Sequence, residues 1–204
     1  MIPGLQIYFT ENQKKQILND VKDILDKGQL SAGEYVKKFE DEWAKICETK
    51  FSVAVSSGGA ALEVIMKGLN LKNKEVIVPS NTFLATSNAV HVAGGTPILA
   101  DVSLNDMNLD LENIKQNTTE KTKAVCIVHV GGIISKEIEE IAKYCEVNDL
   151  YLIEDAAHGH GSSLNNKKPG NFGVAAAYSF TATKTFTSGE GGMIVCNDKD
   201  LDLR

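Results

Sequence analysis

From residue 51 onward, short runs of apolar and β-branched residues alternate with longer segments of helical periodicity. Near-continuous apolar strands that alternate with amphipathic helices are typical of a mostly parallel sheet covered by helices on both faces. The sequence therefore predicts an α/β protein with three layers, αβα, around a seven-stranded sheet. No clear helix separates the last two strands, which allows one of them to run antiparallel. The predicted strands are 51–55, 75–78, 96–102, 123–130, 151–155, 174–180 and 192–196, and the predicted helices between them are 59–69, 82–93, 110–117 and 135–147.

Two further helices are predicted before the first strand. Residues 12–27 carry an apolar stripe that Gly28 ends, and a second helix follows Gly33 with Trp43 on its apolar face. A length of 204 residues suggests one domain or at most two.

The domain organisation follows from this pattern. We expect residues 1–32 to form an N-terminal helical segment and residues 33–204 to form the main domain. The last seven residues, 198–204, resemble the beginning of a helix with acidic residues in its first turn. A chain that stops inside a helix is expected to be truncated, or to be one half of a longer protein.

Charge and cysteine content limit the class of protein. The net charge of −6 disfavours nucleic acid and anionic membranes as partners. The only arginine is Arg204, so a phosphate bound within residues 1–203 must be held by lysines, hydroxyls or backbone N–H groups. The four cysteines lie far apart without a CxxC pair, which favours reduced core thiols. Because we find neither a signal peptide nor a membrane-spanning segment, we expect a cytoplasmic protein.

Polar residues and glycines follow several predicted strands, at the edge where parallel sheets gather their ligand sites. The segment 57–59, with Gly58 and Gly59, joins a strand to a helix whose first N–H groups are free to bind an anion. A phosphate site and a tight turn without ligand both fit this segment. Asp155 follows the fifth strand and either serves a site or caps the next helix, and Ser179 follows the sixth.

Three neighbouring signals leave alternatives open. Phe83 lies where a loop becomes a helix, and it either stacks on a planar cofactor or packs into the core. His158 and His160 could bind a metal with Glu154, but no third histidine or cysteine is placed beside them, so no metal is predicted. His129, at the end of the fourth strand, is a candidate to line the same cleft.

Lys184 carries the main functional hypothesis. It lies among small and hydroxyl residues in a turn between two apolar strand-like runs, so its amine can reach into a cleft. Asp155, leaving another strand end, can face the same cleft. Chemistry with pyridoxal phosphate (PLP) needs this pair, because an amine forms the Schiff base and a carboxylate keeps the ring nitrogen protonated.

The motifs also resemble those of a known family. In chain order they are SSGGAAL, VPSNTFLAT, GGTPILADV, VHVGG, LIEDAAHGHG and NFGVAAAYSFTATKTFTSGEGGMIV. Together, over about residues 33–204, they resemble the DegT/DnrJ/EryC1/StrS family of PLP-dependent sugar aminotransferases. The resemblance implies the fold of the large domain of fold-type I PLP-dependent transferases. Members of that family are considerably longer, which implies that the C-terminal small domain is absent from this chain.

The resemblance implies an activity and its partners. By position, Lys184 would form the internal aldimine and Asp155 would pair with the pyridine nitrogen. The activity would be transfer of an amino group, with glutamate as donor, to a keto group of a nucleotide-linked sugar, in a homodimer. The family's deoxygenating branch has histidine in place of the lysine, so Lys184 favours transamination over a sugar dehydratase. Another hypothesis is a catalytically inactive or partial large domain that acts only in oligomerisation or cofactor binding.

The resemblance also implies how the cofactor is held. Ser179 and the backbone at Gly58 and Gly59 would bind the phosphate, Phe83 would stack on the ring, and His158 would lie beside it. The family usually has Gly-Thr where this chain has Gly58-Gly59, so one hydroxyl contact to the phosphate is missing.

Overall fold

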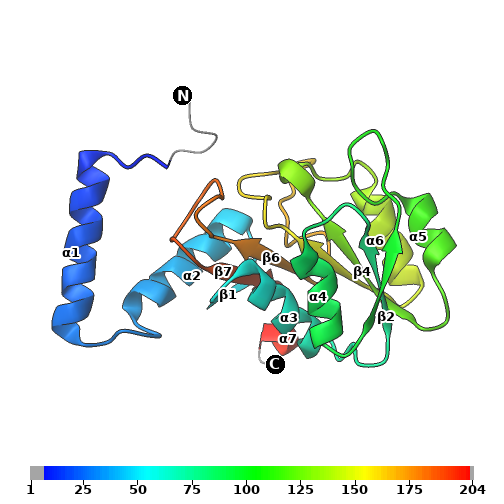
Figure 1. Ribbon diagram of the computed structural model, residues 1–204, viewed down its shortest axis with the longest axis horizontal. Coiled ribbons are helices and arrows are strands. Elements are labelled where there is room, and N and C mark those ends of the chain that lie inside the picture. The colour runs from blue at the N-terminus through cyan, green and yellow to red at the C-terminus, as the bar shows by residue number, and fades with distance from the viewer. Residues whose placement is uncertain (1–6, 203–204) are drawn as a thin grey trace.

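The computed structural model describes residues 7–202, which form a seven-stranded mixed sheet between layers of helices (Figure 1). The strands are β1 (Phe51–Val55), β2 (Glu75–Pro79), β3 (Thr96–Ala100), β4 (Thr122–Val128), β5 (Tyr151–Asp155), β6 (Ala175–Ser179) and β7 (Gly192–Cys196). The helices are α1 (Glu11–Lys27), α2 (Glu34–Cys47), α3 (Gly58–Gly68), α4 (Leu84–Val92), α5 (Leu111–Asn117), α6 (Ile138–Val147), α7 (Lys199–Asp202) and the short 3-10 helix η1 (Val130–Gly132). All seven predicted strands are therefore confirmed, with small shifts at their ends.

The strand order is β1-β7-β6-β5-β4-β2-β3. Only β7 runs against its neighbours: it pairs antiparallel with β1 and with β6, whereas the other neighbouring strands pair in parallel. The expectation that one of the last two strands runs antiparallel is confirmed. Because β1 and the parallel strands share one direction, their carboxyl ends lie at a single edge of the sheet, and β7 begins at that edge.

Alternate residues of each strand face opposite helical layers. In β5, Ile153 belongs to the cluster that contains Leu62 of α3, and its neighbour Leu152 belongs to the cluster that contains Ile138 of α6. Each such fully buried aliphatic side chain contributes roughly 1.5–3 kcal/mol to stability. Helices α3 and α4 therefore cover one face of the sheet, and α5 and α6 cover the other, as predicted for an αβα protein. Helix α2 lies on the α6 side, where Trp43 packs against Tyr178 of β6.

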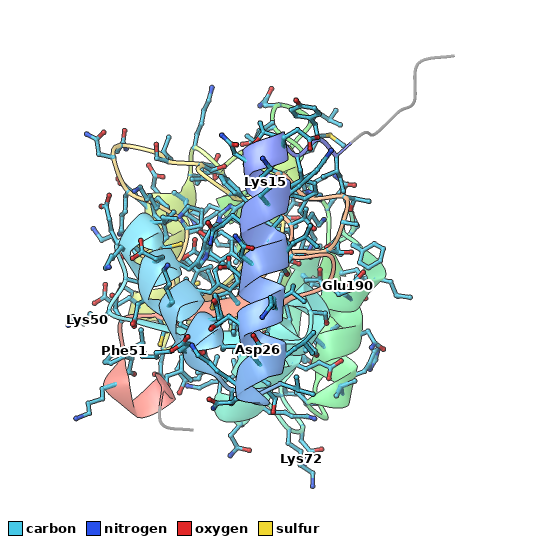
Figure 2. The ribbon with its side chains drawn as sticks, turned by 90° about the vertical axis from the view of Figure 1, so that its left-hand side faces the viewer. Lys15, Asp26, Lys50, Phe51, Lys72 and Glu190 are labelled. Carbon is cyan, nitrogen blue, oxygen red and sulfur yellow. The ribbon has the colours of Figure 1, made fainter. Side chains whose placement is uncertain are left out.

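Helix α1 lies to the side of these layers (Figure 1), with Lys15 and Asp26 on its outward face (Figure 2). It begins at a capping box formed by Thr10 and Gln13, and it ends at Gly28, whose φ of 70° suits glycine. None of its residues is buried. The predicted domain boundary between residues 32 and 33 stays a prediction.

Three other expectations concern the ends and the cysteines. The helix predicted to begin in 198–204 corresponds to α7, and residues 203–204 of that expectation lie outside the described part of the chain, as do residues 1–6. The four cysteines are free and buried, which confirms that they are reduced core thiols. Among residues 7–202, no helix combines the length and the apolar composition that a membrane crossing requires.

Candidate active site

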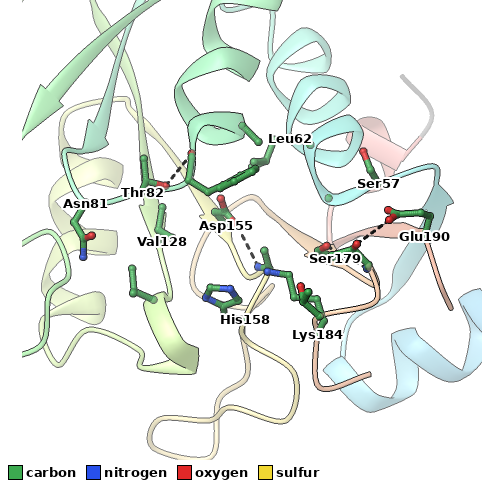
Figure 3. A pocket seen from close by; sticks show the side chains of 18 residues that line it. Ser57, Leu62, Asn81, Thr82, Val128, Asp155, His158, Ser179, Lys184 and Glu190 are labelled. Carbon is green, nitrogen blue, oxygen red and sulfur yellow. Dashed lines mark hydrogen bonds between the residues drawn. The ribbon is translucent and has the colours of Figure 1, made fainter. Parts of the chain in front are cut away.

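The carboxyl ends of the strands surround a cavity of about 490 Å³. All seven residues predicted for the site line it, although they come from segments spread over more than half of the chain: Gly58, Gly59, Phe83, Asp155, His158, Ser179 and Lys184. Figure 3 shows Asp155, His158 and Lys184 converging in the middle of the cavity, with Ser57 and Ser179 toward one end. The sequence motifs therefore meet at one place, as the sheet topology requires.

The end of the cavity near Ser57 and Ser179 is built to bind an anion. The Ser57 hydroxyl caps α3 by accepting the Ala60 N–H at 3.1 Å. The N–H groups of Gly58 and Gly59 lie in the first turn, where the helix itself offers no acceptor for them. A Cβ at Gly58 would lie 2.8 Å from the Ser179 Cβ, which is too close for any side chain. Glycine at position 58 therefore lets the helix start approach β6, and its dipole favours a negatively charged group there.

Position 59 differs from position 58. A Cβ at Gly59 would meet its nearest neighbour, the Ala85 Cβ, at 3.6 Å, which is an ordinary contact. A Cβ therefore fits at position 59, so steric contact does not require glycine there. Among the described residues that line the cavity, Lys184 is the only lysine, so an anion bound at this end would be held by hydroxyls and N–H groups. Glu190, which was not predicted from the sequence, also lines this end and accepts the Thr181 hydroxyl at 2.9 Å.

Asp155 forms the floor of the cavity and is only 5% exposed. Both of its carboxylate oxygens accept hydrogen bonds: Oδ2 accepts from the Thr86 hydroxyl at 2.8 Å, and Oδ1 accepts from the Ala157 N–H at 3.1 Å. These donors fix the orientation of the carboxylate and favour its role as an acceptor. The role of Thr86 was not predicted from the sequence, because Thr86 lies far from Asp155 in the chain and no spacing rule links the two.

The Lys184 side chain extends into the cavity from the turn between β6 and β7. The backbone N–H of Lys184 donates to the Thr181 carbonyl at 3.0 Å, which holds this turn. Burial lowers the pKa of the Lys184 amine, and the negative charge of Asp155 opposes part of that change. Burial and the charge of Lys184 likewise lower the pKa of His158. The His158 ring is oriented by the Gly131 N–H, which donates to its Nδ1 at 3.2 Å. A lysine with a lowered pKa is a better nucleophile at neutral pH than an exposed one.

Phe83 precedes the first residue of α4, and its side chain is 82% exposed at the mouth of the cavity. The interpretation of Phe83 as a core residue is therefore wrong. Exposure of an aromatic ring to water is unfavourable, and a planar ligand that covers the Phe83 ring would remove this cost.

The expectation for His129 needs correction. His129 does not line the cavity, because its ring lies on the other side of the sheet edge and pairs through Nε2 with Glu154 at 3.0 Å, both side chains being fully buried. This pairing also removes Glu154 from any metal site with His158. His160 lies in an aromatic cluster with Trp43 and neighbouring rings. No group of three potential metal ligands occurs within residues 7–202.

Glu154 has a structural role instead. Its Oε1 accepts three backbone N–H groups, from Gly170 at 3.1 Å, Phe172 at 3.0 Å and Gly173 at 2.8 Å. Glu154 and Asp155 thus face opposite sides of β5, where one carboxylate holds the segment before β6 and the other faces the cavity.

The arrangement has a clear chemical capacity. An elongated, planar anion can place its charged group at the start of α3, its ring under Phe83, and a polar ring atom at Asp155. A carbonyl group attached to such a ring would lie in the same cavity as the amine of Lys184.

Comparisons with known proteins agree with this arrangement. A model of the DegT/DnrJ/EryC1/StrS aminotransferase family matches residues 11–204. All of this chain aligns with 56% of the GDP-perosamine synthase of Vibrio cholerae, at 37% identity. The structure of S. venezuelae DesV in complex with a ketimine intermediate superimposes with a TM-score of 0.90 and 31% identity over 95% of this chain and 53% of that one. The E. coli GDP-4-keto-6-deoxy-D-mannose-3-dehydratase with bound hydrated PLP superimposes with a TM-score of 0.88 and 29% identity over 98% of this chain and 52% of that one.

The chain spans about half the length of these relatives. The family match, residues 11–204, includes all seven strands of the sheet and every residue that lines the cavity. The motifs from Gly58 to Lys184 thus predicted the relationship correctly, and the chain belongs to the DegT/DnrJ/EryC1/StrS aminotransferase family.

Proposed function

We propose that this chain is the cofactor-binding part of a PLP-dependent aminotransferase that acts on a nucleotide-linked keto sugar. One observation carries the proposal: the amine of Lys184 and the buried carboxylate of Asp155 converge in a cavity whose far end is the open start of α3. The Vibrio relative is named for the synthesis of GDP-perosamine, a nucleotide-linked amino sugar, which supports the substrate class.

The described residues fit this cofactor. The phosphate would lie against the Gly58 and Gly59 N–H groups and the Ser179 hydroxyl, which are close together because glycine at position 58 lets the start of α3 approach Ser179. Asp155 would accept a hydrogen bond from the protonated ring nitrogen, and Phe83 would cover the ring. When bound, PLP supplies a protonated ring that accepts the electron pair released from the carbon that loses its proton.

Lys184 would have two tasks. Its amine would hold the cofactor by a covalent bond until an amino donor takes its place. The freed amine would then remove the proton from the donor's Cα and deliver a proton to the C4′ atom of the cofactor. Burial lowers the pKa of Lys184 and so favours the neutral form that both tasks need. We propose glutamate as donor, a homodimer as the assembly and the cytoplasm as the location, all on the resemblance to the family.

Two alternatives can be tested against this proposal. The E. coli dehydratase shares the fold, so the fold alone does not discriminate between transfer and dehydration. Lys184 favours transfer, because the resemblance implies a histidine at this position in the deoxygenating branch. A partial large domain that binds cofactor without turnover is the other alternative. Product analysis with a nucleotide-linked keto sugar and glutamate distinguishes an amino sugar from a deoxy sugar and from no product.

Cofactor attachment is the decisive test of the site. Purified protein is incubated with PLP, reduced with borohydride and mapped by peptide mass spectrometry. We expect the pyridoxyl group on Lys184, no visible band in Lys184→Ala, and a normal band in the matched control Lys136→Ala, which removes an exposed lysine. Labelling spread over surface lysines, or an unchanged band in Lys184→Ala, would refute the site. Asp155→Asn should keep some cofactor and lose most of the half-reaction with glutamate.

A further inference from the structure

The buried partner of Asp155 lies outside the cavity. Thr86 is fully buried in the first turn of α4, and it is absent from the residues that line the cavity. Its hydroxyl donates to Asp155 Oδ2 at 2.8 Å. A cofactor in the cavity therefore meets Asp155 but not Thr86, so any effect of Thr86 on the chemistry passes through the carboxylate.

The direction of this hydrogen bond is determined by its surroundings. An ionised carboxylate only accepts, so the single hydroxyl hydrogen of Thr86 must point to Asp155. The Thr82 hydroxyl lies 2.7 Å from the Thr86 oxygen and must then be the donor of that pair. The result is a chain of hydroxyls, Thr82 to Thr86 to Asp155, in which every hydrogen points toward the carboxylate.

The position of Thr86 is equally constrained. Its N–H donates to the Phe83 carbonyl at 3.0 Å, which anchors the residue at the start of α4. On the other side, the Asp155 backbone carbonyl accepts the His129 N–H at 3.0 Å, and the Ala157 N–H holds Oδ1. The carboxylate is thus held by donors from α4 and from its own loop, with the cavity as its open side.

We propose that Thr86 is a positioning residue that keeps the Asp155 carboxylate aimed at the cofactor's ring nitrogen, where it accepts a hydrogen bond from the protonated nitrogen. The proposal rests on the proposed function. Without the hydroxyl, Oδ2 would be a buried acceptor with no donor, so the carboxylate would be more basic and the shared proton would move from the ring nitrogen toward Asp155.

The test uses the full chain loaded with PLP and follows the visible band of the bound cofactor as pH is varied. A ring nitrogen that has lost its proton makes the nitrogen joining Lys184 to the cofactor more basic. Thr86→Val, which is isosteric but lacks the hydroxyl, should therefore raise the pH midpoint of the change in the visible band. The expected shift is about one pH unit, which corresponds to the energy of one hydrogen bond to a charged group. Thr86→Ser should restore the original midpoint.

The matched control is Thr122→Val. Thr122 is also buried, and its hydroxyl accepts the Thr119 N–H at 2.9 Å at the start of β4, remote from the cavity. This variant should lose stability without moving the midpoint. If Thr86→Val fails to fold, Thr86→Ala is measured by the same criterion.

The outcomes separate the two proposals. Wild-type protein that takes up no cofactor overturns the proposed function and this role with it. A normal wild-type band together with an unchanged midpoint in Thr86→Val overturns the role of Thr86 alone. The same holds if Thr86→Ser fails to restore the midpoint or if Thr122→Val shifts it.

Discussion

Replacement of Glu154 by glutamine should cost far more stability than its small change in structure suggests. The carboxylate is fully buried, its Oε1 accepts three backbone N–H groups, and its Oε2 pairs with His129. Glutamine keeps the shape but removes the charge. Its NH₂ group must also face either the three donors or the histidine.

The expected loss follows from the hydrogen bonds. A bond to a charged group contributes roughly 1.5–3 kcal/mol and a neutral one roughly 0.5–1.5 kcal/mol. A difference of about 1 kcal/mol for each of three N–H groups predicts that Glu154→Gln lowers the free energy of unfolding by about 3 kcal/mol. Glu154→Ala leaves all three donors unpaired, at about 1–3 kcal/mol each, which approaches the roughly 5–15 kcal/mol that stabilises a whole domain.

Urea unfolding followed by tryptophan fluorescence measures this directly, because the single tryptophan, Trp43, is 3% exposed in the native protein. Glu146→Gln, the same change at an exposed position of α6, is the control and should stay within about 0.5 kcal/mol of wild type. A Glu154→Gln variant as stable as this control would show that the charge on Glu154 adds nothing to the three bonds.

Two further predictions concern cofactor uptake. Gly58→Ala places a Cβ 2.8 Å from the Ser179 Cβ and should weaken PLP binding about tenfold or more. The matched variant Gly59→Ala, whose Cβ would lie 3.6 Å from its nearest neighbour, should bind PLP normally. Equal affinities of the two variants in an absorbance titration would contradict the steric explanation. Burial lowers the pKa of Lys184, and the negative charge of Asp155 opposes this change. The rate of PLP attachment, plotted against pH, should therefore reach its midpoint at a lower pH than for an exposed lysine. Asp155→Asn removes the opposing charge and should lower that midpoint further. Stopped-flow rates across pH test this, and a midpoint that rises in Asp155→Asn would refute it.

The strands and the gathering of the site can be predicted from the sequence more fully than the side-chain partners can. Alternating apolar runs determine strand positions, and parallel topology brings strand ends together, so the sequence alone is enough to place Asp155 and Lys184 at one cavity. Which face a residue takes just beyond a strand end is harder to predict, because a shift of one residue reverses it. The prediction for His129 is wrong for this reason. The Thr86 contact depends on how α4 packs over β5, which no local pattern encodes.

The place of β7 in the sheet has a consequence for biosynthesis. At its edge of the sheet, β1 pairs with β7 alone, from Phe51 opposite Cys196 to Val55 opposite Gly192. The turn after β1 is also shaped by β7, since a Cβ at Gly192 would lie 2.2 Å from the Ser57 carbonyl oxygen. On the ribosome, the first strand therefore waits for a partner made long after it, and contacts of such long sequence separation form slowly. The turn that would hold the phosphate takes its final shape only once β7 has been synthesised, which makes cofactor capture a late event in the folding of the nascent chain.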